Sequence, residues 1–197
     1  AGRQMRILAE SVYSRYLEKL KKDSIFPDDG YNGEYIYDIA EKLITEYSDQ
    51  YVNSKDINFI KNYSEKMIFK GIKSTLKKIG IIFNNFFNEK DLYDNKEIYK
   101  IIDSLKEEKL IYEKDDAIWF KATALGLNQD RVLIKSTGEP TYRLPDIAYH
   151  KNKFERNYDI IVDVFGADHL DAYPDVLGAC QTLGYHTDKV KVLVHQF

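Results

Sequence analysis

The sequence has a single cysteine, Cys180, and no apolar run approaching the roughly 20 residues that a membrane-spanning helix needs. One cysteine excludes an internal disulfide framework and a metal site built from cysteines alone, and we predict no structural metal. The amino-terminal residues lack the apolar stretch of a signal peptide, so we expect a cytoplasmic protein without a membrane contact.

An excess of positive charge is also missing. The 197 residues carry a formal net charge of −3, with 29 Lys and Arg against 32 Asp and Glu. A free-standing nucleic-acid-binding protein usually has a strongly basic face, so any contact with nucleic acid should be local. The composition is 44% hydrophobic and 14% aromatic, which is enough to form the core of one or two domains.

Apolar residues recur at helical spacing through the first 80 residues. The pattern predicts three helices, over about 5–20, 36–47 and 60–79. In the third, Ile72 and Ile79 are expected to face inward, while a row of lysines on the far face is typical of simple solvent exposure. The aromatic, β-prone run 80–87 then predicts a buried strand.

The rest of the chain alternates helices and strands. Residues 95–109 predict a helix, and 110–112 should pair with 117–120 across a polar turn, giving a small inserted module of helix plus hairpin. Pro145 should hold Leu144 extended and then begin a helix. That helix should end near residue 154. The remaining predicted elements are strands at 131–135, 159–165 and 190–194, and a helix at 174–183. A closing strand–helix–strand order predicts a parallel sheet and an α/β fold.

Polar side chains follow the predicted strands, where ligands bind in open parallel sheets. A further pair lies four residues apart around Pro145. The candidates are Glu89 after the first strand, Asp168 and His169 after the second, His195 and Gln196 after the third, and the pair Tyr142 and Asp146. Converging carboxylates suit a planar cation, because a guanidinium presents five donors in a fixed fork. Arginine fits this description.

The run 135–150 reads Lys-Ser-Thr-Gly-Glu-Pro-Thr-Tyr-Arg-Leu-Pro-Asp-Ile-Ala-Tyr-His, and Phe-Gly-Ala-Asp-His follows at 165–169. This pair of motifs resembles the signature of the arginyl-tRNA synthetases, a family of class I aminoacyl-tRNA synthetases. The opening Ala-Gly-Arg-Gln-Met and the Phe-Pro-Asp-Asp-Gly-Tyr at 26–31 are also similar to the family pattern. The resemblance therefore covers nearly the whole chain.

The resemblance implies a partial Rossmann-like catalytic domain, divided into a first half (1–88), a connective insertion (89–135) and the start of a second half (136–197). It implies that the parent enzyme uses ATP and Mg²⁺ to form arginyl-adenylate and transfers arginine to tRNA(Arg). Glu89, Tyr142 and Asp146 would contact the guanidinium and amino group of arginine, with Asp168 close by in the same pocket. His169, His195 and Gln196 would lie on the nucleotide side.

The family's two ATP-binding signatures, of the His-Ile-Gly-His and Lys-Met-Ser-Lys-Ser types, do not occur in this sequence. Both ends look cut, so we interpret the chain as an internal fragment that is inactive by itself and that self-associates through its cut edge. Because those signatures stabilise the phosphates in the transition state, the 197-residue polypeptide should give no arginine-dependent ATP–pyrophosphate exchange. Exchange by the pure polypeptide would contradict this.

Two other functions remain open from the residues. The chain could come from a class I synthetase for another amino acid, or from a non-catalytic tRNA-binding or scaffold protein of the same fold. Each candidate residue also has a structural interpretation. Asp146 and Asp168 are well placed to begin helices, Tyr142 could be a half-buried strand aromatic, and Glu89 could be a solvated loop acid. His169, His195 and Gln196 could simply be satisfied polar groups at strand ends.

Overall fold

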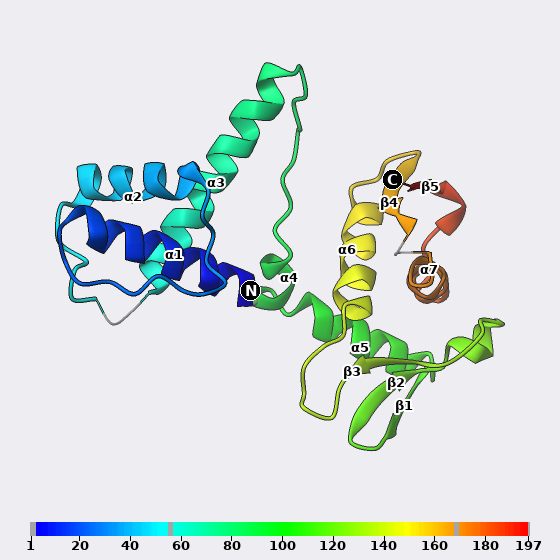
Figure 1. Cartoon of the computed structure of the whole chain (residues 1–197). Helices are drawn as coiled ribbons and strands as arrows, with labels where there is room; N and C mark the ends of the chain where they lie inside the picture. Colours follow the sequence, from blue (N-terminus) through cyan, green and yellow to red (C-terminus); the bar gives the residue numbers. More distant parts are fainter. Residues whose placement is uncertain (1–2, 55–56, 168–169, 197) are drawn as a thin grey trace. The chain divides into compact units, whose positions relative to one another are not determined.

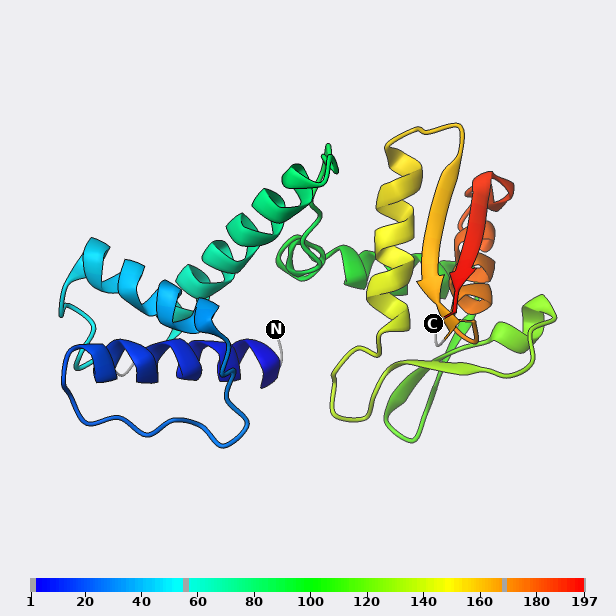
Figure 2. The ribbon, with the colours of Figure 1, turned by 45° about the horizontal axis from the view of Figure 1, so that its top comes forward.

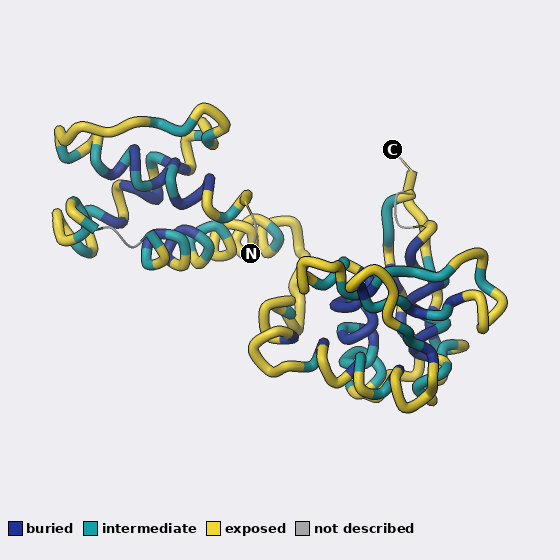
Figure 3. The backbone as a smooth tube through the Cα atoms, turned by 90° about the horizontal axis from the view of Figure 1, so that it is seen from below, coloured by how far each residue is buried: buried dark blue, intermediate teal, exposed yellow. Residues whose placement is uncertain are grey.

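The computed structural model describes residues 3–54, 57–167 and 170–196 and divides the chain into two compact units, Ala1–Phe86 and Phe87–Phe197. Figure 1 labels their helices and strands, and Figure 3 shows that the buried positions gather inside each unit. The predicted three-part division at 1–88, 89–135 and 136–197 stays a prediction.

The first unit is helical. It contains α1 (Arg3–Lys19), α2 (Glu34–Tyr47) and α3 (Asn58–Lys78), as the apolar spacing predicted. Val12, Tyr16, Leu43 and Ile60 have no exposed surface and lie in the core that the three helices share. The Tyr16 hydroxyl donates a 2.8 Å hydrogen bond to the Ser48 carbonyl, which satisfies its one polar atom in that core.

Two predictions for this unit are wrong. Ile72 and Ile79, expected to face inward, are 43% and 66% exposed, because the shared core reaches only the first half of α3. Residues 81–88 form no strand; the chain is extended there and Ile82 is 75% exposed. β-prone residues become a strand only where a neighbouring strand pairs with them, and none of the described strands does so here.

The second unit begins with the inserted module. After α4 (Lys90–Asp94) and α5 (Glu97–Glu107), strands β1 (Ile111–Lys114) and β2 (Ala117–Phe120) form the predicted antiparallel hairpin. Its turn residues, Asp115 and Asp116, both have positive φ, as a two-residue hairpin turn requires. The 3₁₀ turn η1 (Ala122–Leu125) leads to β3 (Arg131–Ile134), which adds to β2 as a third antiparallel strand.

The parallel sheet follows. α6 (Arg143–Glu155) leads to β4 (Ile161–Gly166), then α7 (Tyr173–Thr182), the 3₁₀ turn η3 (Thr187–Lys189) and β5 (Val190–His195). β4 and β5 pair in parallel from Ile161 opposite Val190 to Gly166 opposite His195, which confirms the predicted α/β class. In Figure 2 the carboxyl ends of both strands lie at the same end of the unit as the start of α6.

One face of this sheet is apolar and exposed. Val162, Val164 and Leu193 are 52%, 68% and 57% exposed, whereas Ile161 and Asp163, on the opposite face of β4, are buried. Parallel strands are normally covered on both faces, and exposed apolar patches favour association.

The isolated 197-residue polypeptide is therefore expected to self-associate, and Val164→Lys should weaken that association. Light scattering after gel filtration at increasing concentration tests this. A wild-type polypeptide that stays monomeric at all concentrations would contradict it.

Candidate functional site at the start of α6

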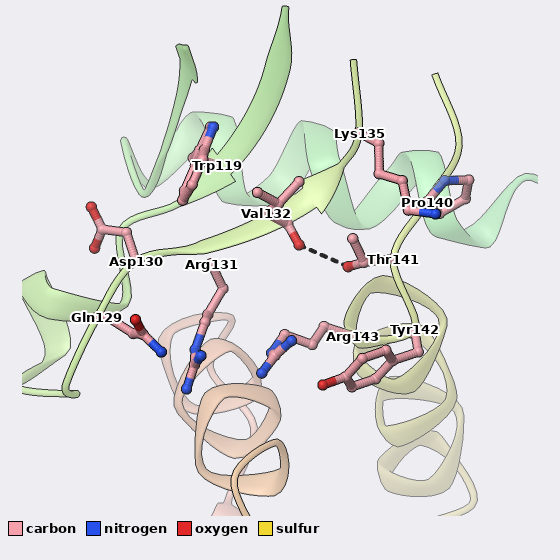
Figure 4. Close-up of a pocket in the computed structure, with 10 residues that line it drawn as sticks. All are labelled: Trp119, Gln129, Asp130, Arg131, Val132, Lys135, Pro140, Thr141, Tyr142 and Arg143. Carbon is pink, nitrogen blue, oxygen red and sulfur yellow. Dashed lines mark hydrogen bonds between the residues drawn. The ribbon is translucent and has the colours of Figure 1, made fainter. Parts of the chain in front are cut away.

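Tyr142 and Asp146 lie one turn apart at the start of α6. Tyr142 is the residue before the helix, and its carbonyl accepts a 3.2 Å hydrogen bond from the Asp146 backbone N–H. The Tyr142 side chain is exposed and lines an open pocket of about 420 Å³, shown in Figure 4, whereas Asp146 is partly buried. The pair thus joins a solvent-accessible phenol to a more protected carboxylate.

The expectation that Pro145 would hold Leu144 extended is wrong, because α6 already begins at Arg143. Pro145 occupies the first turn, where backbone N–H groups have no acceptor within the helix, so its missing N–H is tolerated. Leu144 has no exposed surface and lies in the core of the second unit. Its burial offsets the steric preference against helical conformations before proline.

Glu89 does not follow a strand, contrary to the prediction, because residues 81–88 form none. It is exposed and directly precedes α4. Both candidate carboxylates nevertheless act on the phenol of Tyr93. Burial raises the pKa of that phenol, and charge interactions with Glu89, Tyr99 and Asp146 raise it further. The structure therefore places Glu89 and Asp146 within electrostatic reach of one tyrosine.

At the carboxyl edge of the parallel sheet, His195 ends β5 opposite Gly166 and Gln196 follows it, both exposed. Asp168 and His169, predicted for the same edge, lie outside the described residues. In the part of the chain that the structure describes, no group of three or more His, Cys, Asp or Glu side chains could hold a metal ion. No helix among those residues is long and apolar enough to cross a membrane.

A charged cluster holds the start of α6 against β3 and α7. Asp175 is 4% exposed, and its Oδ2 accepts a 2.9 Å hydrogen bond from Arg143 Nε and lies 2.8 Å from Arg131 Nε. The second contact is an ion pair without hydrogen-bond alignment. The exposed Asp171 accepts hydrogen bonds from the Nη2 atoms of both arginines. Figure 4 shows both guanidinium groups directed toward α7.

A second buried cluster joins α6 to β4. The His150 ring lies between the Asp146 carbonyl oxygen, 2.8 Å from Nδ1, and Asp163 Oδ2, 2.8 Å from Nε2. Lys153 Nζ lies 2.5 Å from the other Asp163 oxygen. Burial by itself would raise the pKa of Asp163, but the hydrogen bonds from His150 and Lys153 outweigh it and hold that pKa below its usual value. Asp163 is therefore ionised near neutral pH.

Comparison with known proteins identifies relatives along the entire chain. The chain is 53% identical over 197 residues to an arginine–tRNA ligase of Desulfotalea psychrophila and 50% identical over 202 residues to one of Chlorobaculum parvum. A solved arginyl-tRNA synthetase structure from Campylobacter jejuni superposes on the whole chain with a TM-score of 0.86 at 30% identity. The chain is homologous to arginyl-tRNA synthetases throughout.

The chain spans 36% and 37% of the lengths of those two arginine–tRNA ligases, and 44% of the C. jejuni chain. A Plasmodium falciparum arginyl-tRNA synthetase shares the fold at 15% identity, with a TM-score of 0.61 over 98% of this chain and 39% of its own. No family model matches the sequence. The resemblance inferred from residues 135–150 and 165–169 is confirmed.

Sequence reasoning did not single out His150, Asp163, Arg131, Arg143 or Asp175. A signal existed for His150, because it lies four residues after Asp146 and hence on the same side of the predicted helix. No local signal existed for the arginine–aspartate cluster, since its members come from elements up to 44 positions apart, Arg131 on β3 and Asp175 on α7.

Proposed function

We propose that this chain is part of an arginine–tRNA ligase that activates arginine with ATP to arginyl-adenylate and transfers it to tRNA(Arg) for protein synthesis. The observation that supports this best is 53% identity to an arginine–tRNA ligase along all 197 residues. We propose a cytoplasmic location for the enzyme, as for protein synthesis in general.

We infer that the start of α6 forms part of the arginine site. The substrate guanidinium is a planar cation, and the partly buried Asp146 carboxylate is the charge partner that it needs. The exposed Tyr142 hydroxyl can accept or donate one further hydrogen bond. Glu89 is proposed for the same pocket, because its negative charge and that of Asp146 both act on the Tyr93 phenol, whose pKa is raised mainly by burial. Asp168 is proposed for the same pocket and lies outside the described residues.

The nucleotide side is proposed for the carboxyl edge of β4 and β5, with His169, His195 and Gln196, because ligands of open parallel sheets bind at that edge. Bound ATP and Mg²⁺ would supply the activated phosphate in the whole enzyme. The described residues offer no three-ligand group for the metal, so none of their side chains is assigned to it. Their part in the reaction is to bind and orient arginine.

The full-length protein tests this function. With ATP, Mg²⁺ and tRNA, it should attach labelled arginine to the tRNA in an acid-precipitable, alkali-labile form, as expected for an ester to the terminal ribose. Lysine, a cation without the planar fork, is the matched control and should give no product. Attachment of lysine but not arginine would contradict the proposal.

A further inference from the structure

Tyr142, the residue before α6, and two residues within α6 form a stripe that runs from the surface into the interior. Tyr142, Asp146 and His150 are spaced by four residues, so each lies about one helical turn beyond the last and on nearly the same side. Exposure falls along the stripe: Tyr142 is 57% exposed, Asp146 is partly buried, and His150 is 5% exposed. The two proposed arginine ligands thus share one side of the helix with a buried histidine.

Both nitrogens of the His150 ring lie 2.8 Å from an oxygen that can only accept. One is the Asp146 backbone carbonyl, and the other is the Asp163 carboxylate. The imidazole therefore bridges a backbone carbonyl of α6 and a carboxylate of β4 through its two ring nitrogens. Lys153 completes the group on Asp163, and its Nζ lies 3.5 Å from His150 Nε2.

This bridge ties one peptide of α6 to one residue of β4. The Asp146 carbonyl lies within α6, where it serves as a backbone acceptor of the helix. The imidazole is a second group on that carbonyl, and it links the first turns of α6 to Asp163 of β4. Hydrogen bonds to charged groups in a buried setting are strong and directional. The bridge fixes the rotation of α6 about its axis and its position along β4, and hence the direction in which Asp146 and Tyr142 project.

We propose that His150 is a positioning residue for arginine recognition, which bridges Asp163 of β4 to the Asp146 peptide and so orients Asp146 and Tyr142 toward the substrate. This inference rests on the proposed function. A ligand held in fixed geometry loses affinity when its support shifts by a fraction of an ångström to an ångström. Loss of the bridge should therefore act on arginine and spare ATP.

Two variants in the full-length enzyme each remove half of the bridge. His150→Asn retains a donor for the Asp146 carbonyl but is too short to reach Asp163. His150→Gln can reach Asp163 but no longer donates a hydrogen bond to the Asp146 carbonyl. Each is expected to raise the KM for arginine about 3- to 10-fold in pyrophosphate exchange, as the loss of one buried hydrogen bond implies. The KM for ATP and kcat should stay within about twofold, on the same reasoning.

Leu105→Ala is the matched control, because Leu105 has no exposed surface and lies in the same core, but is neither a proposed arginine ligand nor part of the His150 bridge. It should lower the melting temperature without changing the KM for arginine. If neither His150 variant is soluble, Asp163→Asn, which keeps the shape and removes the charge, serves in their place. It should likewise raise the KM for arginine.

The outcomes separate the two proposals. A wild-type enzyme without arginine-dependent exchange would contradict the proposed function and this inference together. An arginine-specific wild type whose KM for arginine is unchanged in both His150 variants, or rises equally in Leu105→Ala, would contradict the positioning role alone.

Discussion

Asp146→Asn is expected to lower kcat/KM for arginine by about one to two orders of magnitude in the full-length enzyme. The substitution keeps the shape of the side chain and removes the charge that a desolvated guanidinium needs. Hydrogen bonds to charged groups are worth roughly 1.5–3 kcal/mol, and about 1.4 kcal/mol corresponds to a factor of ten. Steady-state pyrophosphate exchange at varied arginine concentration measures the loss.

Tyr142→Phe is the graded companion, because it deletes only an exposed hydroxyl and should cost less than Asp146→Asn. The KM for ATP should change little in either variant, since neither residue belongs to β4 or β5 or follows them, where the nucleotide side is proposed. Equal losses for arginine and ATP in Asp146→Asn, with a lower melting temperature, would show that Asp146 only supports the start of α6.

Asp175→Ala is expected to lower the free energy of unfolding of the second unit by about 2–4 kcal/mol. The substitution removes the carboxylate that two largely buried arginines share. The side chains of Arg131 and Arg143 are 13% and 11% exposed, while that of Asp175 is 6% exposed. Asp171 remains beside both arginines and offsets part of the loss. Urea unfolding of the 197-residue polypeptide, followed by the fluorescence of Trp119 in this unit, measures the effect.

Asp171→Ala is the matched control for this cluster. Its side chain is 72% exposed and its contacts are screened by solvent, so its removal should cost less than about 1 kcal/mol. Comparable losses in the two variants would mean that the buried position of Asp175 is not what makes the cluster stabilising.

Local patterns were enough for most of the helices and for the hairpin. Apolar spacing placed α1, α2 and α5, and the polar run 113–116 correctly predicted a hairpin between β1 and β2, although Glu113 and Lys114 belong to β1 and only Asp115 and Asp116 form the turn. The strand–helix–strand order also predicted parallel β4 and β5. These features depend on residues close in sequence, whose periodicity records which side is buried.

Features that depend on distant partners were not predictable. The run 80–87 has the composition of a strand but forms none. In contrast, β3 pairs with β2, and no residue near β3 in the sequence predicted that pairing. Whether a β-prone segment pairs is decided by what the fold brings beside it. The start of α6 was missed for a related reason, because burial of Leu144 in the core outweighs the local effect of Pro145.

For the site, the sequence paired Tyr142 with Asp146 around Pro145 and placed Asp146 in the first turn of a helix, but it did not reveal that Tyr142 directly precedes that helix, nor the groups that hold the pair there. Asp163 lies 13 positions after His150 and on a strand, so their contact follows only from packing α6 on β4. Whether Glu89, Tyr142, Asp146 and Asp168 bind arginine stays a prediction.

Amino-acid specificity of the full-length protein tests the central claim most directly. Pyrophosphate exchange measured with each of the twenty amino acids in turn should be driven by arginine, with tRNA(Arg) supplied in every assay. Exchange driven by another amino acid, or by none in a correctly folded protein, would contradict the assignment of α6 to arginine recognition.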